Sequence, residues 1–70
     1  MIDITRLTDA DKGRRVRYHA CGVTEWGTIR RWNERFIFVL YVRKQLDGGQ
    51  AYDRTGHTPE ATAPENLEFV

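Results

Sequence analysis

Polar and apolar residues alternate from residue 14 to residue 20. In an extended chain, Val16, Tyr18 and Ala20 share one face, and the residues between them share the other: Arg15, Arg17 and His19. A period of two is typical of a strand with one buried and one solvated face. Residues 14–20 are therefore predicted to form a half-buried strand whose solvent face is basic.

A second strand is predicted over residues 25–32, after Cys21 and Gly22. Strict alternation would place Gly27, Ile29 and Arg31 on one side. The other side would carry Trp26, Thr28, Arg30 and Trp32. Glycine inside a strand often marks a bend or a bulge, which is expected here at Gly27.

The most apolar run of the chain covers residues 36–42. Asn33 and Glu34 precede it and fit a tight turn, so the chain over residues 25–43 is predicted to be a β-hairpin. Three alternate residues can line a core: Ile37, Val39 and Tyr41. The residues between them need other cover or stay exposed: Phe36, Phe38, Leu40 and Val42.

The remaining segments carry weaker patterns. Residues 8–13 are polar and predict a turn or one short helical turn. Residues 44–60 hold three of the six glycines and almost no periodicity, so they are expected to be a long loop or the tip of a hairpin. Residues 61–63 and 67–70 predict two short strands, joined by one helical turn that begins at Pro64.

Composition limits the classes of protein to consider. The chain has 70 residues and is predicted to be one mainly β domain with a small core. Cys21 is its only cysteine, so no disulfide can form within it. Together with the absence of an apolar run long enough to cross a bilayer, this predicts a cytoplasmic protein with no membrane association. Eleven basic residues oppose ten acidic ones, which argues against a polyanion binder that relies on bulk charge.

No group of residues suggests catalysis or metal binding. The chain has no serine, and Cys21 and His19 lie two residues apart at the end of a strand, where their side chains diverge. His57 lies in a glycine-containing segment without a second histidine or a cysteine nearby, so a zinc site lacks ligands. We therefore expect a protein that is not an enzyme and has no catalytic residue, cofactor or metal.

The order of the expected strands, with ATAPENLEF as a one-turn helix leading into the last one, resembles an SH3-like small barrel. That group includes the Tudor, KOW and Sm-like folds, and the resemblance implies a five-stranded antiparallel barrel. A Tudor-type aromatic cage would need four rings around one pocket, which the alternation does not favour: Tyr18, Trp26, Phe36 and Tyr41. The basic motif of KOW domains is only loosely matched by residues 11–16.

Three segments are also similar to small uncharacterised proteins of bacteriophages and prophages. They are GRRVRY, WGTIRRWNERFIFVLY and ATAPENLEF, which are spread over residues 13–69. This resemblance implies a phage or prophage protein and carries no known activity.

An apolar surface is the first candidate for binding. Four large residues fall opposite the expected core positions of the hairpin: Trp26, Trp32, Phe38 and Leu40. If they are exposed, they predict contact with an unidentified protein partner or with a second copy of the chain through the hairpin of residues 25–43. The alternative is that residues 44–60 or the N-terminal segment fold over them.

A basic surface is the second candidate. Four arginines could contact phosphates, while Trp26 and Trp32 stack on unpaired bases. These arginines are Arg15, Arg17, Arg30 and Arg31. The alternative is a solvated face whose arginines pair with Glu25, Glu34 and Glu68. The sequence thus predicts first a noncatalytic interaction module and second a nucleic-acid-binding barrel.

Overall fold

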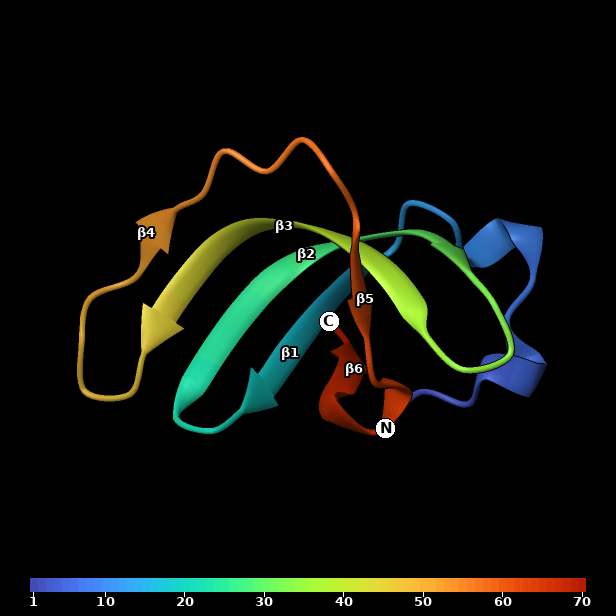
Figure 1. The fold of residues 1–70 in the computed structure, drawn as a ribbon, viewed down its shortest axis with the longest axis horizontal. Helices are drawn as coiled ribbons and strands as arrows, with labels where there is room; N and C mark the ends of the chain where they lie inside the picture. The colour runs from blue at the N-terminus through green and yellow to red at the C-terminus, as the bar shows by residue number, and fades with distance from the viewer.

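A computed structural model describes residues 1–70 as one antiparallel sheet of six strands with three short 3₁₀ helices (Figure 1). The strands are β1 (Arg15–Ala20), β2 (Val23–Trp32), β3 (Ile37–Leu46), β4 (Tyr52–Asp53), β5 (Glu60–Thr62) and β6 (Leu67–Phe69). The helices are η1 (Ile4–Arg6), η2 (Asp9–Asp11) and η3 (Pro64–Asn66). The prediction of a mainly β chain with a helical turn before the last strand is confirmed. Since each helix is a single turn, none could span a membrane.

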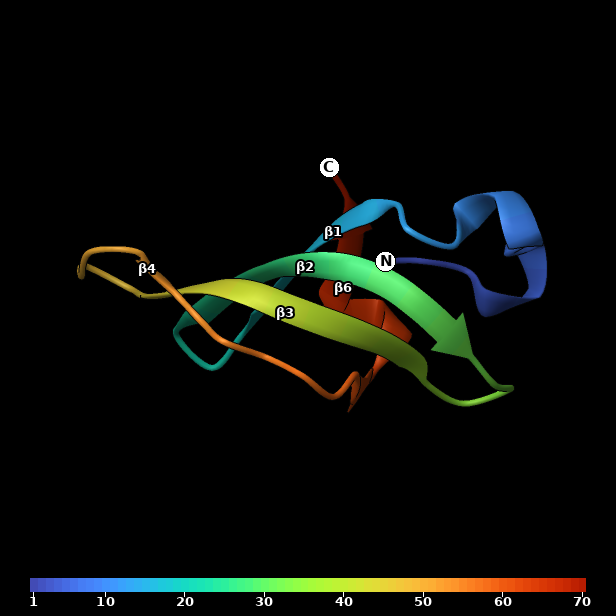
Figure 2. The same cartoon turned by 90° about the horizontal axis from the view of Figure 1, so that it is seen from above.

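The sheet is an open antiparallel structure. Its strand order is β4-β3-β2-β1-β6, and β5 pairs with β3 on the same edge as β4. The five predicted strands are all present, and β4 is an additional short one. The sheet is not closed, so the predicted barrel is not confirmed. Figure 2 shows β4 at one end of the sheet and η1 and η2 at the other.

Two turns set the register of the central hairpins. Cys21 and Gly22 join β1 to β2 and both have positive φ angles, 52° and 76°, as a two-residue type I′ turn requires. The next turn spans residues 33–36, because Asn33 Oδ1 accepts the N–H groups of Arg35 and Phe36 at 2.8 Å each. Phe36 is therefore part of the turn, and the predicted strand begins one residue later, at Ile37.

Of the two forms expected for residues 44–60, the hairpin tip is present in the first part, and the expectation of one long loop is wrong there. Strand β3 continues to Leu46, the chain turns, and β4 pairs back onto Arg43 and Lys44, so the first part of this segment is the tip of a hairpin. Its residues show no apolar alternation because neither face of the sheet is covered there. Periodicity reports burial and cannot detect a strand that is exposed on both faces.

The core lies between one face of β1–β3 and the segments that cross it. Its buried residues are Ile2, Val16, Ile29, Ile37, Val39, Tyr41 and Leu67. The inward positions predicted at Val16, Ile29, Ile37, Val39 and Tyr41 are confirmed, whereas Arg31, predicted on the same side as Ile29, is exposed. Burial raises the pKa of Tyr41 to about 12, while its hydroxyl is hydrogen bonded to the Thr62 hydroxyl at 2.7 Å. Tyr41 is therefore a neutral, satisfied core residue at pH 7.

Two β-bulges interrupt the pairing of β2 with β3. At the first, between Trp26 and Gly27, β3 has the extra residue Val42. The bulge expected at Gly27 is confirmed, and a Cβ atom there would lie 2.9 Å from Tyr41 Cα, which only glycine avoids.

The second bulge, between Ile29 and Arg31, has the extra residue Arg30 on β2. After it, Trp32 pairs with the buried Ile37 and packs against the core. The prediction that Trp26 and Trp32 share one face is therefore wrong, because one inserted residue inverts the alternation.

Candidate functional site

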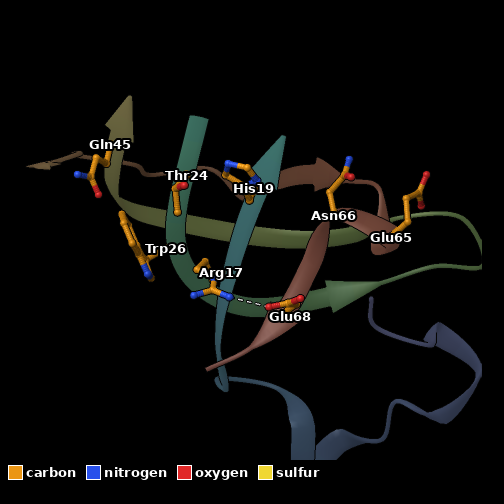
Figure 3. A pocket seen from close by; sticks show the side chains of 8 residues that line it. All are labelled: Arg17, His19, Thr24, Trp26, Gln45, Glu65, Asn66 and Glu68. Atoms are coloured by element: carbon orange, nitrogen blue, oxygen red, sulfur yellow. Dashed lines mark hydrogen bonds and ion pairs between the residues drawn. The ribbon is translucent and has the colours of Figure 1, made fainter. Parts of the chain in front are cut away.

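A groove of about 470 Å³ lies on the face of the sheet that points away from the core (Figure 3). Cross-strand pairing places its residues together, since Arg17 lies opposite Trp26 and His19 lies opposite Thr24. The full lining is Arg17, His19, Thr24, Trp26, Gln45, Glu65, Asn66 and Glu68. Strands β1, β2, β3 and β6 all contribute, so the groove depends on the assembled sheet.

Trp26 is the central residue of this outer face. It is half-buried, and it pairs with Arg17 on β1 and with Arg43 on β3. It also lines a second hollow of about 350 Å³ that includes Arg15, Val42 and Val70. We call the surface formed by Arg15, Arg17, Trp26, Val42 and Arg43 the Trp26 face.

The charges of the Trp26 face are nearly balanced. Arg17 Nη2 lies 2.7 Å from Glu68 Oε2, a pair drawn in Figure 3. Arg43 Nη1 lies 3.6 Å from Asp53 Oδ1. Arg15 has no carboxylate oxygen within 4.0 Å, so it is the basic residue of the face that is free to pair with a partner.

The four apolar residues predicted as a partner surface are not brought together. Trp26 lies on the outer face, whereas Trp32 packs against the core with Lys12 Nζ 5.7 Å from its ring centre. Phe38 is half-buried, and the guanidinium carbon of Arg31 lies over its ring, 4.4 Å from the ring centre. Leu40 is half-buried beside Gly56. Of the four, Trp26 is the one that belongs to the candidate site.

The four predicted arginines also separate. Arg15 and Arg17 lie on the Trp26 face, Arg30 is the exposed extra residue of a bulge, and Arg31 stacks on Phe38. The expected pairing of an arginine with Glu68 is present, but Glu25 pairs with Arg54 instead of an arginine of the first two strands, and Glu34 has no ion pair. Sequence reasoning missed Arg43, because its position opposite Trp26 depends on the bulge at Val42.

The other candidate groups for chemistry are dispersed. Cys21 is exposed in the first hairpin turn, and His19 Nε2 lies 3.7 Å from Asp47 Oδ1. No group of three or more histidine, cysteine or acidic side chains could hold a metal ion. That the protein is not an enzyme stays a prediction.

A second polar cluster lies on the opposite side of the sheet. The Arg54 guanidinium is hydrogen bonded to Glu25 and to Glu60. The hydrogen bond with Glu25 is the main reason that the pKa of Arg54 is raised. The rings of Tyr18 and Tyr41 meet edge to face beside this cluster, with centres 6.1 Å apart. This cluster could not be predicted from the pattern of residues, since Arg54 lies in a segment without periodicity.

Comparison with family models, with curated proteins and with solved structures finds no match for this chain. Its class therefore follows from fold and site: a small open-sheet β protein with a tryptophan at the centre of a charge-balanced face.

Proposed function

We propose that this chain is a noncatalytic protein-interaction module whose contact surface is the Trp26 face. The observation that carries the proposal is the position of Trp26: it lies on the outer face, between two arginines, and lines two hollows. Trp26 and Arg43 belong to the hairpin of residues 25–43, so the proposal keeps the hairpin as the binding element.

The residue types of the Trp26 face support a protein partner. Tryptophan and arginine are enriched among the residues that dominate binding energy in protein interfaces, and such residues cluster near the centre of the contact. The ion-paired Arg17 and Arg43 form a polar rim around Trp26. A fitting partner would present an apolar side chain to the hollow beside Val42 and a carboxylate to Arg15.

Charge balance makes nucleic acid the second candidate. Arginines neutralised by Glu68 and Asp53 would have to exchange these partners for phosphates, which weakens the counterion release that drives binding to DNA and RNA. One observation favours this candidate: Arg15 is free of an ion pair and lines the same hollow as Trp26.

Site-specific photocrosslinking tests the proposal. The photoreactive amino acid benzoylphenylalanine is incorporated in place of Val42 while the protein is produced in cells, and irradiation should then yield one discrete protein adduct. The same amino acid in place of Phe36, in the distant hairpin turn, should yield none. The adduct partner is then purified and its binding measured. Trp26→Ala should raise the Kd about 30-fold or more, as expected for the central residue of an interface.

Tyr52→Ala is the matched control, because Tyr52 is an aromatic residue that is half exposed on β4, outside the Trp26 face. It should change the Kd less than about twofold. Equal losses for both variants, or adducts from both crosslinking sites, would contradict the proposal. An adduct between two copies of the chain would identify the partner as a second copy, so that the module would be a homodimer. Salt-sensitive shifts of the Trp26 indole signal with single-stranded DNA would instead favour nucleic acid.

The finer fold assignment is also proposed. The meander β1-β2-β3, the helical turn η3 before β6, and the pairing of β6 with β1 support an SH3-like arrangement of the sheet. Phage or prophage origin and a cytoplasmic location stay predictions.

A further inference from the structure

The segment between β4 and β5 is too long to pair with the strand edge that it crosses. Asp53 lies opposite Arg43, and Glu60 lies opposite Val39, so only residues 40–42 of β3 lie between these pairs. The chain covers this distance with the six residues 54–59, which we call the strap. The strap therefore cannot keep a strand register with β3, and its path forms the arch above that strand in Figure 1.

The strap covers the edge of β3 without continuing the sheet. Its only backbone hydrogen bond to β3 runs from the Arg54 N–H to the Val42 carbonyl oxygen, at 2.8 Å. Gly56 approaches closely, since a Cβ atom there would lie 2.7 Å from the Tyr41 carbonyl oxygen. Pro59 has no N–H to donate. An unpaired strand edge of this kind is a site where an extended peptide can add to a sheet.

Side chains hold the strap in place. The Arg54 guanidinium bridges Glu25 on β2 and Glu60 on β5, with Nη1 3.2 Å from Glu60 Oε2. The Glu25 side chain is only 14% exposed. If Arg54 leaves, a largely buried carboxylate loses its cation, which is costly unless another cation replaces it.

A hollow beside the Arg54 position could receive such a replacement. It measures about 250 Å³ and is lined by both carboxylates and by two tyrosine rings, Tyr18 and Tyr41. The aliphatic stem of a long basic side chain packs well on such rings, while its charged end reaches the carboxylates.

We propose that the strap is a latch over a second binding surface, and that this surface takes an extended peptide carrying an arginine. The peptide backbone would pair with β3 at residues 40–42, and its guanidinium would take the place of Arg54 between Glu25 and Glu60. Charge complementarity and the existing arginine of the chain define this occupant. The position for the arginine, between Glu25 and Glu60, is on the opposite side of the sheet from Trp26, and the two surfaces share only Val42. The inference therefore does not rest on the proposed function.

A peptide titration followed by proton-nitrogen NMR tests this inference. The probe is acetyl-Thr-Val-Arg-Val-Thr-amide, and the control peptide has citrulline, a neutral analogue of the same shape, in place of arginine. Arg54→Ala removes the latch side chain. It should lower the apparent Kd for the arginine peptide at least tenfold relative to the unmodified chain, because Arg54 no longer competes with the peptide for Glu25 and Glu60. Signals of residues 40–42 and of Glu25 should shift, and the citrulline peptide should bind at least tenfold more weakly.

Arg14→Ala is the matched control variant, since it removes a distant arginine that is paired with Asp11 at 2.9 Å. It should bind the peptide like the unmodified chain. Equal affinity for all three proteins would overturn the inference, as would absence of binding to a folded Arg54→Ala variant or shifts at Glu25 without shifts at residues 40–42. The Trp26 indole signal should shift less than the signals of residues 40–42 and Glu25, because the indole lies on the opposite face and shares only the neighbour Val42 with the peptide surface.

Hydrogen exchange of the unmodified chain provides a test that does not depend on the folding of a variant. Latch opening breaks the bond from the Arg54 N–H to Val42, whereas the Ile29 N–H, bonded to the Arg14 carbonyl oxygen at 3.0 Å, lies in the core. The Arg54 amide should exchange at least tenfold faster than the Ile29 amide, relative to their intrinsic rates. Equal protection would show that the strap opens only with global unfolding and would overturn the latch.

Discussion

The two ends of the sheet differ in whether other segments cover the inner face of the strands. At one end, β5, η3, β6 and the N-terminal segment cover the inner face, and residues such as Ile29 and Leu67 are fully buried. At the other end, residues 20–24 and 44–53 form an arm with no second layer. There the same face continues through Val23 to Leu46 and Tyr52, which are 52% and 50% exposed. Covering segments, more than strand pairing, determine which end carries the core.

Truncating one leucine at each end should give the largest contrast. Leu67→Ala removes a fully buried side chain and should lower the free energy of unfolding by about 2–5 kcal/mol. Leu46→Ala in the arm should lower it by less than about 1 kcal/mol, because the side chain is already half exposed. Urea unfolding followed by circular dichroism measures both. Similar losses would mean that the arm is as important to stability as the core.

This contrast also explains what the sequence could predict. Val16 and Ile29 were correctly placed in the core, because their neighbours along the strand are polar. Ile37 and Val39 were also correctly placed, although their neighbours in residues 36–42 are apolar too. The extension of β3 to Leu46 was missed, since a strand without a covered face has no periodic signal.

The candidate site was harder to predict than the core. A bulge adds one residue without any change in composition, so the pattern of residues 25–32 could not reveal that Trp32 turns inward. Trp26 was nominated from its residue type and lies on the outer face. Its neighbour Arg43 and the link between Arg54 and Glu25 require the three-dimensional pairing of distant segments.

Tyr41 lies where the covered end meets the arm, and its ionisation should be the next largest effect. Burial raises its pKa to about 12, above the value of about 10 for an unfolded chain. A group with a raised pKa in the folded state contributes stability that is fully present below pH 10 and lost as the pH rises towards 12. Two pKa units correspond to a loss of about 2–3 kcal/mol over that interval.

The matched comparison is Tyr41→Phe, which removes the titrating group from the core. At neutral pH it should be about 1 kcal/mol less stable, through loss of the hydrogen bond to Thr62. Between pH 10 and 12 its stability should fall less steeply than that of the unmodified chain, measured by urea unfolding at each pH. Tyr52→Phe, at an exposed site, should leave the steeper slope unchanged. Parallel curves for all three proteins would contradict the assignment.

Gly27 lies at the boundary between the two ends, and replacing it should give the smallest of the three effects. A Cβ atom there would lie 2.8 Å from the Leu40 carbonyl carbon, so β2 and β3 must separate or shift at the bulge. Gly27→Ala should therefore lower the free energy of unfolding by about 1–3 kcal/mol. Gly49→Ala, in the arm, should have less effect, because its closest atom would be 3.3 Å away. Since Trp26 precedes the bulge, its indole NMR signal should shift in the Gly27 variant and stay in place in the Gly49 variant. An unmoved signal would mean that the position of Trp26 does not depend on the bulge.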